Sequence, residues 1–415
     1  MNLPASLAPL RDRDFRWFYS ARSVSLFGSS LAGVALVFGV LEVSNRAGDL
    51  GIVLAAHSIP MAAFMLLGGV VADRFSRSTV LRLSHLGAAL TQGAVAVLLI
   101  TGQAQLWMLA VLEFANGVIV AFTFPALQGV VPQVVPRNEL QQANAMLAFS
   151  RNAAYIAGPS VAGVLVVTVG AGWAIAVDAV TYAVAALCMS RLALPTALAA
   201  ASSSMLRDLR VGWTEFTART WVWVVVAAFG VMNMIFAGVW ATLGPTIAKA
   251  TIGEDAWGLV LSAEAVGFLV ASLVLLRVTI RFPLRAGMIG ALGIGAPMLL
   301  LGISPRVLPL VAAALLSGAG TEVFGIGWST ALQEHVPGPV LSRVASYDAL
   351  GSFVAIPIGE LLVGPLTHLL GQRTVVLAGT AIFVLVGLAT LLSSSVRNLE
   401  HLPAPAATGE AHATP

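Results

Sequence analysis

Long apolar stretches, separated by short polar or Gly/Pro-containing breaks, dominate the pattern of the chain. Continuous apolar runs predict membrane-spanning helices, because such a helix needs about 20 mostly apolar residues and a barrel strand only about 10. The pattern therefore predicts an all-α polytopic membrane protein with twelve transmembrane helices. The predicted spans are 17–42, 50–72, 79–101, 105–129, 144–169, 172–193, 221–247, 256–280, 285–304, 307–331, 345–369 and 373–394.

The composition agrees with lipid exposure. Hydrophobic residues make up 58% of the chain and charged residues 10%, whereas soluble domains carry about 25% charged residues. A water-soluble protein so poor in charge could not cover its own surface, so the apolar excess is expected to face membrane lipid.

The basic residues test the number of spans. If the N-terminus is cytoplasmic, only four of the 22 basic residues fall in outer segments, namely Arg46, Lys249, Arg306 and Arg373. Cytoplasmic loops are enriched in Lys and Arg. A missed helix would move many of the basic residues from inner to outer segments and remove this asymmetry. The distribution predicts a multi-pass protein of the cell membrane, plasma or inner, with both termini cytoplasmic.

The two halves of the chain resemble each other. Residues 51–57, Gly-Ile-Val-Leu-Ala-Ala-His, match residues 258–264, Gly-Leu-Val-Leu-Ser-Ala-Glu, and the same offset aligns residues 74–75 with 281–282. Each half thus contains six spans in the same order. Two pseudo-symmetric six-helix bundles, residues 1–193 and 221–394, are predicted, with a binding site between them.

The segment between the halves, residues 194–220, is predicted to be a cytoplasmic linker containing an amphipathic helix. Leu206, Leu209, Trp213 and Phe216 share one helical face, as in a helix that lies at a membrane interface. A passive connector and a role in gating are equally compatible with this pattern. Residues 395–415 are rich in Ala, Pro and Gly and are predicted to be a disordered tail.

A sharp motif, Gly-Val-Val-Ala-Asp-Arg-Phe-Ser-Arg-Ser, follows the second span at residues 69–78. Gly69 permits two helices to approach closely. Asp73 at a helix end can accept hydrogen bonds from the N-terminus of a neighbouring helix, where the helix dipole is positive. Arg74 and Arg77 are suited to the anionic cytoplasmic membrane surface.

This motif resembles the loop signature G-x-x-x-D-R-x-G-R-K of the major facilitator superfamily, although Ser76 and Ser78 depart from it. The resemblance implies that the loop latches the cytoplasmic side and favours an outward-facing state. Asp348, at the start of the eleventh span, is the candidate partner of Arg74 or Arg77. A simple stop-transfer loop is the alternative.

The equivalent loop of the second half, residues 277–285, keeps its arginines but has Ile280 where the acid would stand. A neutral aliphatic side chain cannot form the ion pair that the first loop is expected to form. We therefore expect the second loop to have lost the latch.

A second stretch, residues 125–163, is rich in Pro and Gly. It resembles the fourth-to-fifth-helix region of the efflux branch that includes enterobactin and macrolide exporters. Arg151, Gly158, Pro159 and Gly163 also resemble, in degenerate form, the helix-five motif of proton-driven drug exporters. A Gly-Pro pair kinks a helix and frees a carbonyl group, which suits a helix that bends during alternating access. The alternative is that Gly and Pro are ordinary in membrane helices.

Several ionisable residues fall inside the predicted spans, where a charge costs about 2.5–3.5 kcal/mol on insertion scales. Glu113 and Glu264 are the leading candidates for proton or cationic-substrate sites, and His57, Glu322 and Asp178 are further candidates. Because His57 and Glu264 occupy matching positions in the two halves, we expect them to face each other across the central cavity. For each residue, the alternative is a hydrogen-bonded polar lock between helices.

Motifs of other functions are missing from the sequence. It contains no P-loop and no catalytic or metal-ligand spacing, so we expect neither an enzyme nor a cofactor nor a metal site.

Together with the resemblance, the pattern predicts a monomeric secondary transporter that exports a small amphipathic molecule, such as a drug, siderophore or secondary metabolite, by proton antiport. Nucleic acid is not an expected partner. An importer or symporter on the same fold, a non-transporting sensor or scaffold, and a polytopic membrane enzyme remain alternatives.

Overall fold

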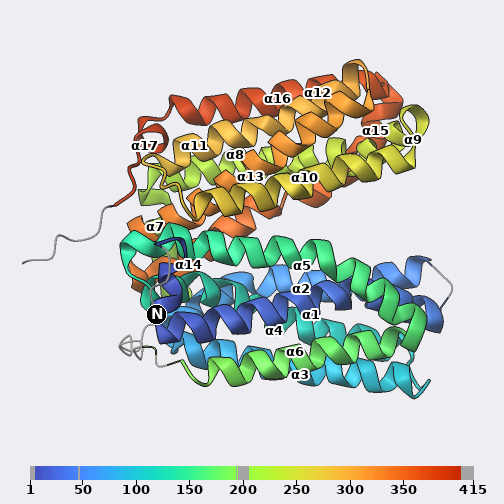
Figure 1. The fold of residues 1–415 in the computed structure, drawn as a ribbon, viewed down its shortest axis with the longest axis vertical. Helices are drawn as coiled ribbons and strands as arrows, with labels where there is room; N and C mark the ends of the chain where they lie inside the picture. Colours follow the sequence, from blue (N-terminus) through green and yellow to red (C-terminus); the bar gives the residue numbers. More distant parts are fainter. Residues whose placement is uncertain (1–4, 45–46, 193, 195–204, 403–415) are drawn as a thin grey trace, which may run out of the picture.

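The computed structural model describes residues 5–44, 47–192, 194 and 205–402. Within these residues all regular structure is helical, and twelve helical segments are long and apolar enough to cross a membrane. The prediction of twelve spans is therefore confirmed. Figure 1 shows that the helices form two bundles lying side by side, one built from each half of the chain.

The first bundle contains the first six spans, and each is one helix except the fifth, which begins with a short 3-10 turn. Its elements are η1 (Ala5–Arg11), α1 (Arg13–Val43), α2 (Ala47–Arg74), α3 (Arg77–Ile100), α4 (Leu106–Val134), η2 (Arg137–Glu139), α5 (Leu140–Val169) and α6 (Ala171–Met189). The connecting helix α7 (Met205–Ala218) follows, within the linker where an amphipathic helix is predicted.

Three spans of the second bundle are interrupted. The seventh contains a π-helical segment, η3, the ninth a 3-10 turn, η4, and the eleventh a break between α14 and α15. The elements are α8 (Thr220–Ile235), η3 (Phe236–Leu243), α9 (Gly244–Thr251), α10 (Glu254–Leu275), α11 (Pro283–Ala291), η4 (Leu292–Ile294), α12 (Gly295–Ile303), α13 (Val307–His335), α14 (Gly338–Phe353), α15 (Ile356–Leu370), α16 (Gln372–Leu392) and α17 (Ser394–Arg397).

Several spans begin earlier than the hydrophobic pattern predicts, and in two of them the added turns contact the opposite bundle. Helix α5 starts at Leu140 rather than at residue 144, and α14 starts at Gly338 rather than at residue 345. The added turns carry polar side chains, such as Gln141 and Arg343, that bond to the opposite bundle. A pattern search for apolar runs stops at such residues because it assumes that polar groups face water.

The duplication of the chain is visible in two equivalent helix contacts. A Cβ atom added to Gly117 in α4 would lie 2.1 Å from the carbonyl oxygen of His57 in α2. In the second bundle, a Cβ atom on Gly318 in α13 would lie 2.0 Å from the carbonyl oxygen of Glu264 in α10. Only glycine fits either contact, so the second and fourth spans of each half pack in the same way.

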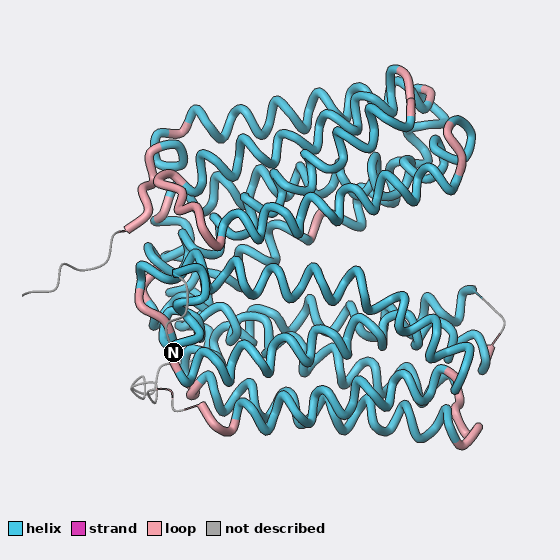
Figure 2. The backbone as a smooth tube through the Cα atoms, in the orientation of Figure 1, coloured by secondary structure: helices cyan, strands magenta, loops and turns pink. Residues whose placement is uncertain are grey.

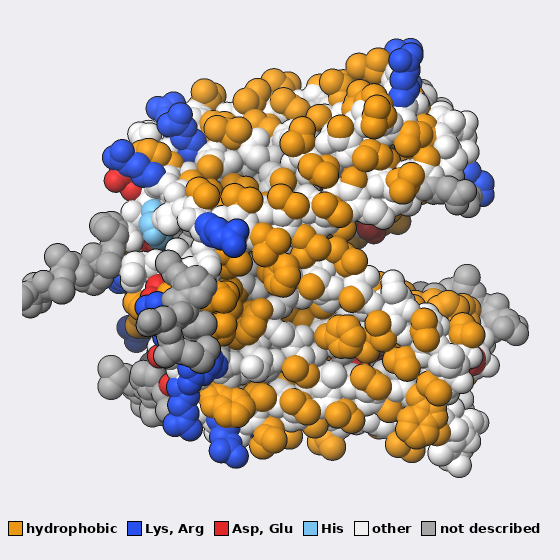
Figure 3. Space-filling model, viewed as in Figure 1, with side chains coloured by type: hydrophobic (Ala, Val, Ile, Leu, Met, Phe, Trp, Pro, Cys, Tyr) orange, Lys and Arg blue, Asp and Glu red, His pale blue; other side chains and the backbone are white. Residues whose placement is uncertain are grey.

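Apolar side chains cover the flanks of both bundles. Leu90, Val167, Leu316 and Leu392 expose between 67% and 87% of their surface, and Figure 3 shows apolar side chains along the length of the visible face. Exposed leucine and valine on this scale suit contact with acyl chains rather than water. The protein is a multi-pass membrane protein.

The two bundles touch at the end where η1 and α17 lie and diverge at the other end (Figures 1 and 2). We call these the terminal end and the far end. At the far end Figure 3 shows a hollow between the bundles. Toward its floor lies a cavity of about 380 Å³, lined by α5 on one side and by α10 and α13 on the other.

Residues 395–402, which follow the last span, are ordered, although the sequence predicts a disordered tail from residue 395. Residues Ser394–Arg397 form helix α17, in which Val396 is fully buried. The backbone N–H of His401 then donates to the carbonyl oxygen of Arg281, and His401 Nδ1 lies 2.7 Å from Glu334 Oε1. The predicted disorder is wrong for residues 395–402, because these contacts hold the segment against the second bundle; residues 403–415 lie outside the described part.

Candidate transport pathway

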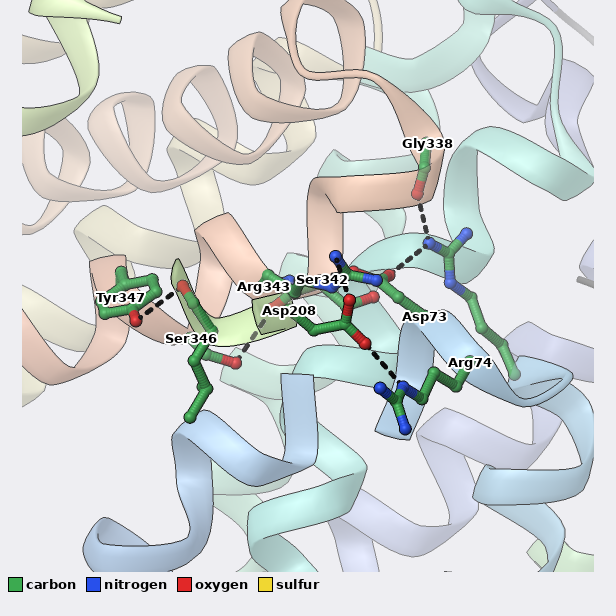
Figure 4. A network of polar contacts seen from close by, with 10 residues as sticks. Asp73, Arg74, Asp208, Gly338, Ser342, Arg343, Ser346 and Tyr347 are labelled. Atoms are coloured by element: carbon green, nitrogen blue, oxygen red, sulfur yellow. Dashed lines mark hydrogen bonds and ion pairs between the residues drawn. The ribbon is translucent and has the colours of Figure 1, made fainter. Parts of the chain in front are cut away.

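The predicted latch loop lies where α2 of the first bundle meets α14 of the second (Figure 4). The buried carboxylate of Asp73 is 3.2 Å from Arg77 Nη2 and 3.2 Å from Arg343 Nε. It also accepts a hydrogen bond of 3.3 Å from the backbone N–H of Arg343. One acid thus joins an arginine of its own bundle to an arginine of the other.

Arg77 extends this contact to two backbone carbonyl groups. Its guanidinium donates 2.7 Å hydrogen bonds to the carbonyl oxygens of Gly129 in α4 and Gly338 at the start of α14. Its side chain is 6% exposed. A buried guanidinium that satisfies several acceptors in fixed directions holds those groups in one arrangement.

Helix α7 adds a second acid to the latch. Asp208 Oδ2 lies 2.6 Å from Arg74 Nε, and Asp208 Oδ1 lies 3.6 Å from Arg343 Nη1. On the same helix, the carbonyl oxygen of Leu209 accepts a hydrogen bond from the Tyr347 hydroxyl. The linker helix therefore bonds to both bundles at the terminal end.

Asp348 is not the partner of these arginines among the described contacts. Its carboxylate accepts 2.8 Å and 3.2 Å hydrogen bonds from Trp328 Nε1 and Ser352 Oγ, both inside the second bundle. Asp348 lies more than one helical turn beyond Arg343 in α14, so its side chain points at α13 rather than at α2. The acid that reaches Arg74 is Asp208, which the sequence motif did not include.

The helices of the latch are in close contact at Gly69. A Cβ atom there would lie 2.3 Å from Ser346 Oγ and 2.9 Å from the carbonyl oxygen of Ser342 in α14. Any larger residue at position 69 would force α2 and α14 apart. The glycine therefore sets how closely the two bundles approach.

The equivalent crossing between α5 and α10 uses an amide instead of ions. Gln141 Nε2 donates to the carbonyl oxygens of Leu275 and Val278 at 3.0 Å and 2.5 Å. Gln141 Oε1 accepts a 3.0 Å hydrogen bond from the backbone N–H of Ile280. As expected from Ile280, the ionic latch is missing here, but the crossing itself persists because Gln141 satisfies unpaired backbone groups after α10.

A third contact between the bundles lies on α5 and α13. Asn144 Nδ2 donates to Thr330 Oγ1 at 3.0 Å and to Gln333 Oε1 at 2.9 Å. Gln333 Nε2 reaches the carbonyl oxygen of Gln128 at 3.5 Å. That carbonyl lacks its usual helical partner because Pro132, four residues on, has no N–H.

Arg151 and Glu322, which the sequence singled out separately, form one ion pair between the bundles. Arg151 Nη2 in α5 lies 2.9 Å and 3.1 Å from the two carboxylate oxygens of Glu322 in α13. The Glu322 side chain is buried, whereas the Arg151 side chain is 42% exposed to the cavities around it. Both residues line the cavity of about 380 Å³ between the bundles.

Two residues of the helix-five motif have a packing role in this structure. A Cβ atom on Gly158 would lie 2.0 Å from Ser30 Oγ, so the glycine lets α5 pack against α1. Pro159 lies inside α5 and leaves the carbonyl group of Tyr155 without its helical donor. Gly163 has open space around it, and no contact here requires a glycine.

The first bundle contains a polar cavity of about 420 Å³, lined by side chains of α1 to α6. His57, Glu113 and Asp178 all line it. His57 Nδ1 lies 3.2 Å from Glu113 Oε2, and Gln92 Nε2 donates a 3.2 Å hydrogen bond to Glu113 Oε1. Asp178 accepts a 3.4 Å hydrogen bond from Thr181. Among the described residues, no three His, Cys, Asp or Glu side chains are arranged to hold a metal ion.

His57 and Glu264 do not face each other across a central cavity, so that prediction is wrong. The His57 ring is turned toward Glu113 within its own bundle. Glu264 is 9% exposed and accepts a 3.3 Å hydrogen bond from Trp240 Nε1 within the second bundle. Trp240 lies in the π-helical segment η3, whose irregular turn the hydrophobic pattern could not predict.

Sequence reasoning missed three residues that connect the bundles at the terminal end. Arg343, Asp208 and Gln141 were not assigned as site residues, although each bonds across the two bundles. The available signal was weak: all three are polar residues at the edge of an apolar or amphipathic helix. Their partners lie more than 130 positions away in sequence, so no local pattern identifies them.

Two duplicated six-helix bundles that meet at one end around a charged loop define the transporter fold of the major facilitator superfamily. Within it, the chain belongs to the family described as Transmembrane secretion effector, whose model matches residues 4–410. This family consists of transporters and not of enzymes.

The chain is similar in sequence to two curated exporters. The Multidrug efflux pump Tap of Mycolicibacterium fortuitum is 26% identical over 388 residues, covering 90% of this chain and 94% of that protein. The Enterobactin exporter EntS of Escherichia coli is 24% identical over 363 residues, covering 85% of each chain. Among solved structures, a bacterial homologue of the iron transporter ferroportin in an outward-facing state has the same fold, with a TM-score of 0.73 at 17% identity, covering 92% of this chain and 99% of that one.

Proposed function

We propose that the protein exports a small amphipathic molecule from the cell in exchange for protons. The family and the two curated relatives, one named a multidrug efflux pump and the other an enterobactin exporter, support export. A cavity that combines ionisable and apolar side chains supports an amphipathic substrate, because it offers both kinds of contact.

The observation that carries the proposal is the pair formed by His57 and Glu113 in the polar cavity of the first bundle. Glu113 is buried, accepts from Gln92, and lies 3.2 Å from an imidazole. Protonation of the carboxyl group would remove its attraction for a charged imidazole and turn one acceptor oxygen into a donor. A proton can therefore change the shape and charge of the cavity, which is what coupling to a substrate requires.

Glu113 is a better candidate for the proton site than Glu264. Glu113 and Asp178 both line the cavity of the first bundle. Glu264 is held by an indole N–H inside the second bundle and lines none of the described cavities around the pathway.

The arginine distribution supports an orientation with the terminal end in the cytoplasm. In that orientation the latch of Asp73, Arg77 and Arg343 closes the cytoplasmic side, and the hollow at the far end opens outward. Export then requires a second state in which the latch is broken and the two bundles close at the far end, as in alternating access around a central site.

The test is transport by the purified protein in liposomes with an imposed pH gradient. The substrate is first chosen by measuring efflux of antibiotics, dyes and siderophores from overexpressing cells, with and without an uncoupler. We expect Glu113→Gln to abolish flux driven by the pH gradient while substrate exchange without a gradient persists. The opposite direction of coupled flux would indicate an importer.

Glu264→Gln is the matched comparison, because it makes the same chemical change in the other bundle. We expect it to keep flux driven by the pH gradient within about twofold of the parent protein. Loss of coupling in Glu264→Gln together with normal coupling in Glu113→Gln would overturn the assignment of the proton site. If neither variant nor the parent responds to the gradient, proton antiport itself is wrong.

A further inference from the structure

A small polar cavity lies between the two bundles, bounded by α1, α4, α5 and α13. It measures about 110 Å³. The polar side chains that line it are those of Arg22, Gln128, Asn144, Arg151, Ser329 and Gln333. Among the described residues lining this cavity there are two arginines and no carboxylate, so its walls carry positive charge.

Arg22 is the unusual member of this set. It lies nine residues into α1, about 14 Å from the start of the helix at 1.5 Å per residue, and lines both this cavity and the larger cavity of the first bundle. Among the contacts of the described residues, its guanidinium has neither a hydrogen-bond acceptor nor an ion-pair partner. The ionisable groups that interact with it are Tyr182, Arg151, Tyr155 and His85, none of them a carboxylate.

Arg151 does not balance this charge. Its one described ion-pair partner is Glu322, which approaches from α13. Arg22, Arg151 and Glu322 together therefore carry a surplus of one positive charge. An arginine inside the membrane is expensive unless it meets water or a negative group. The unsatisfied guanidinium needs an anion or ordered water at this position.

The carboxylates of the larger cavity do not serve as that anion in this state. Glu113 contacts His57 and Gln92, and Asp178 contacts Thr181. These acids also line only the larger cavity, whereas Arg22 lines both. The small cavity therefore offers positive charge to a negative group supplied from outside the chain.

We propose that Arg22 and Arg151 form a binding site for a carboxylate-sized anion in the cavity between the bundles. Guanidinium groups bind carboxylates through two parallel N–H donors, so two of them can hold one anion from both sides. With about 30 Å³ per water molecule, the cavity has room for a group the size of three or four waters. A carboxylate with a short apolar stem has this size.

The site also links anion binding to the contact between the bundles. An anion between the two arginines competes with Glu322 for Arg151, and the Arg151–Glu322 pair joins α5 to α13. Binding therefore weakens an ion pair that holds the bundles together on the floor of the hollow. This inference rests on the proposed function where it identifies the anion as part of the exported molecule; the binding site itself does not.

The experiment is isothermal titration of the purified full-length protein with sodium benzoate and with its neutral analogue benzamide. We expect the parent protein to bind benzoate and not benzamide. Arg22→Gln should weaken benzoate binding at least tenfold, and Arg22→Lys should retain part of it. Glu322→Gln should strengthen it several-fold, because Arg151 loses its competing partner; this gain cannot come from a folding defect.

Two control variants make the same chemical changes away from the cavity. Arg373→Gln removes an exposed arginine at the start of α16, and Glu215→Gln removes a carboxylate on the surface of α7. Both should bind benzoate like the parent protein. Equal binding of benzoate and benzamide, or unchanged benzoate binding in Arg22→Gln and Glu322→Gln, would overturn the site.

A competition arm identifies the source of the anion. If sodium chloride displaces benzoate, a free inorganic anion also fits the site. If it does not, the site selects organic carboxylates. Both results support an anion site. Benzoate binding without any pH-driven transport would reject the proposed function and keep the site. Proton-coupled transport without benzoate binding would reject the site alone.

Discussion

The two bundles cross each other twice at the terminal end, and the two crossings use different chemistry. Where α2 meets α14, a buried acid lies between two arginines, and a second acid from α7 joins them. Where α5 meets α10, one glutamine bonds to a carbonyl group at the end of α10 and to two backbone groups of the α10–α11 connection. Both crossings involve the loop between the second and third spans of a half.

The difference shows that a duplicated fold can keep its geometry while its energetics diverge. Removing one member of a buried ion pair costs about 3–5 kcal/mol, because the remaining charge is left without a partner. A neutral hydrogen bond contributes about 1 kcal/mol. Substitutions that leave a charge unpaired at the α2–α14 crossing are therefore expected to destabilise the closed terminal end more than substitutions at the α5–α10 crossing.

Removing the central charge of the latch should have the largest effect. Asp73→Asn leaves Arg77 and Arg343 buried without their shared carboxylate. A loss of about 3–5 kcal/mol shifts the equilibrium toward opening of the terminal end by about two to three and a half powers of ten, because 1.4 kcal/mol is a factor of ten. We expect coupled transport to be lost, since the closed state is no longer held.

The opening can be measured by labelling an introduced cysteine. In a Cys188→Ala background, which removes the single native thiol, Ser329→Cys places a reactive group in the cavity between the bundles. A membrane-impermeant maleimide applied from the side of the termini should react much faster when Asp73→Asn is present. Glu215→Gln, which breaks the partly exposed pair with Arg219 on α7, is the control and should leave the rate unchanged.

The spacing of the same crossing can be tested without changing a charge. A Cβ atom at position 69 would lie 2.3 Å from Ser346 Oγ and 2.9 Å from a backbone oxygen of α14. Gly69→Ala should therefore hold α2 and α14 apart, at a cost of about 1–3 kcal/mol to the closed state, and raise the labelling rate about fivefold or more.

Gly163→Ala makes the same substitution where nothing lies within 4 Å. Its labelling rate should equal that of the parent protein. The comparison separates the effect of the crowded position 69 from any general effect of replacing glycine in a membrane helix. Equal rates for the two variants would mean that the terminal end does not close as tightly as the packing at Gly69 requires.

The sequence was sufficient for the architecture because each span carries its own signal. Twenty apolar residues are visible without knowing their neighbours, and the match of residues 51–57 with 258–264 reveals the duplication. The latch loop was also found, because Asp73, Arg74 and Arg77 lie within five consecutive positions.

The partners across the bundles could not be predicted in the same way. Whether Arg74 reaches Asp348 or Asp208 depends on which turn of α14 faces α2 and on where α7 lies, and neither is encoded locally. His57 and Glu264 show the same limit. Their backbones occupy equivalent places against Gly117 and Gly318, yet their side chains turn to Glu113 and Trp240 because the neighbouring helices differ.

The amide crossing should respond least to substitution. Gln141→Ala removes two donors to the carbonyl oxygens of Leu275 and Val278 and one acceptor for the N–H of Ile280. These backbone groups lie at a helix end, where water can replace part of the lost bonding, so we expect a cost of about 1 kcal/mol and a labelling rate at most about tenfold higher. The same Ser329→Cys assay measures it beside Asp73→Asn. If Gln141→Ala opened the terminal end as strongly as Asp73→Asn, the two crossings would contribute equally to the closed state. The difference between ionic and neutral contacts would then not affect the stability of the closed terminal end.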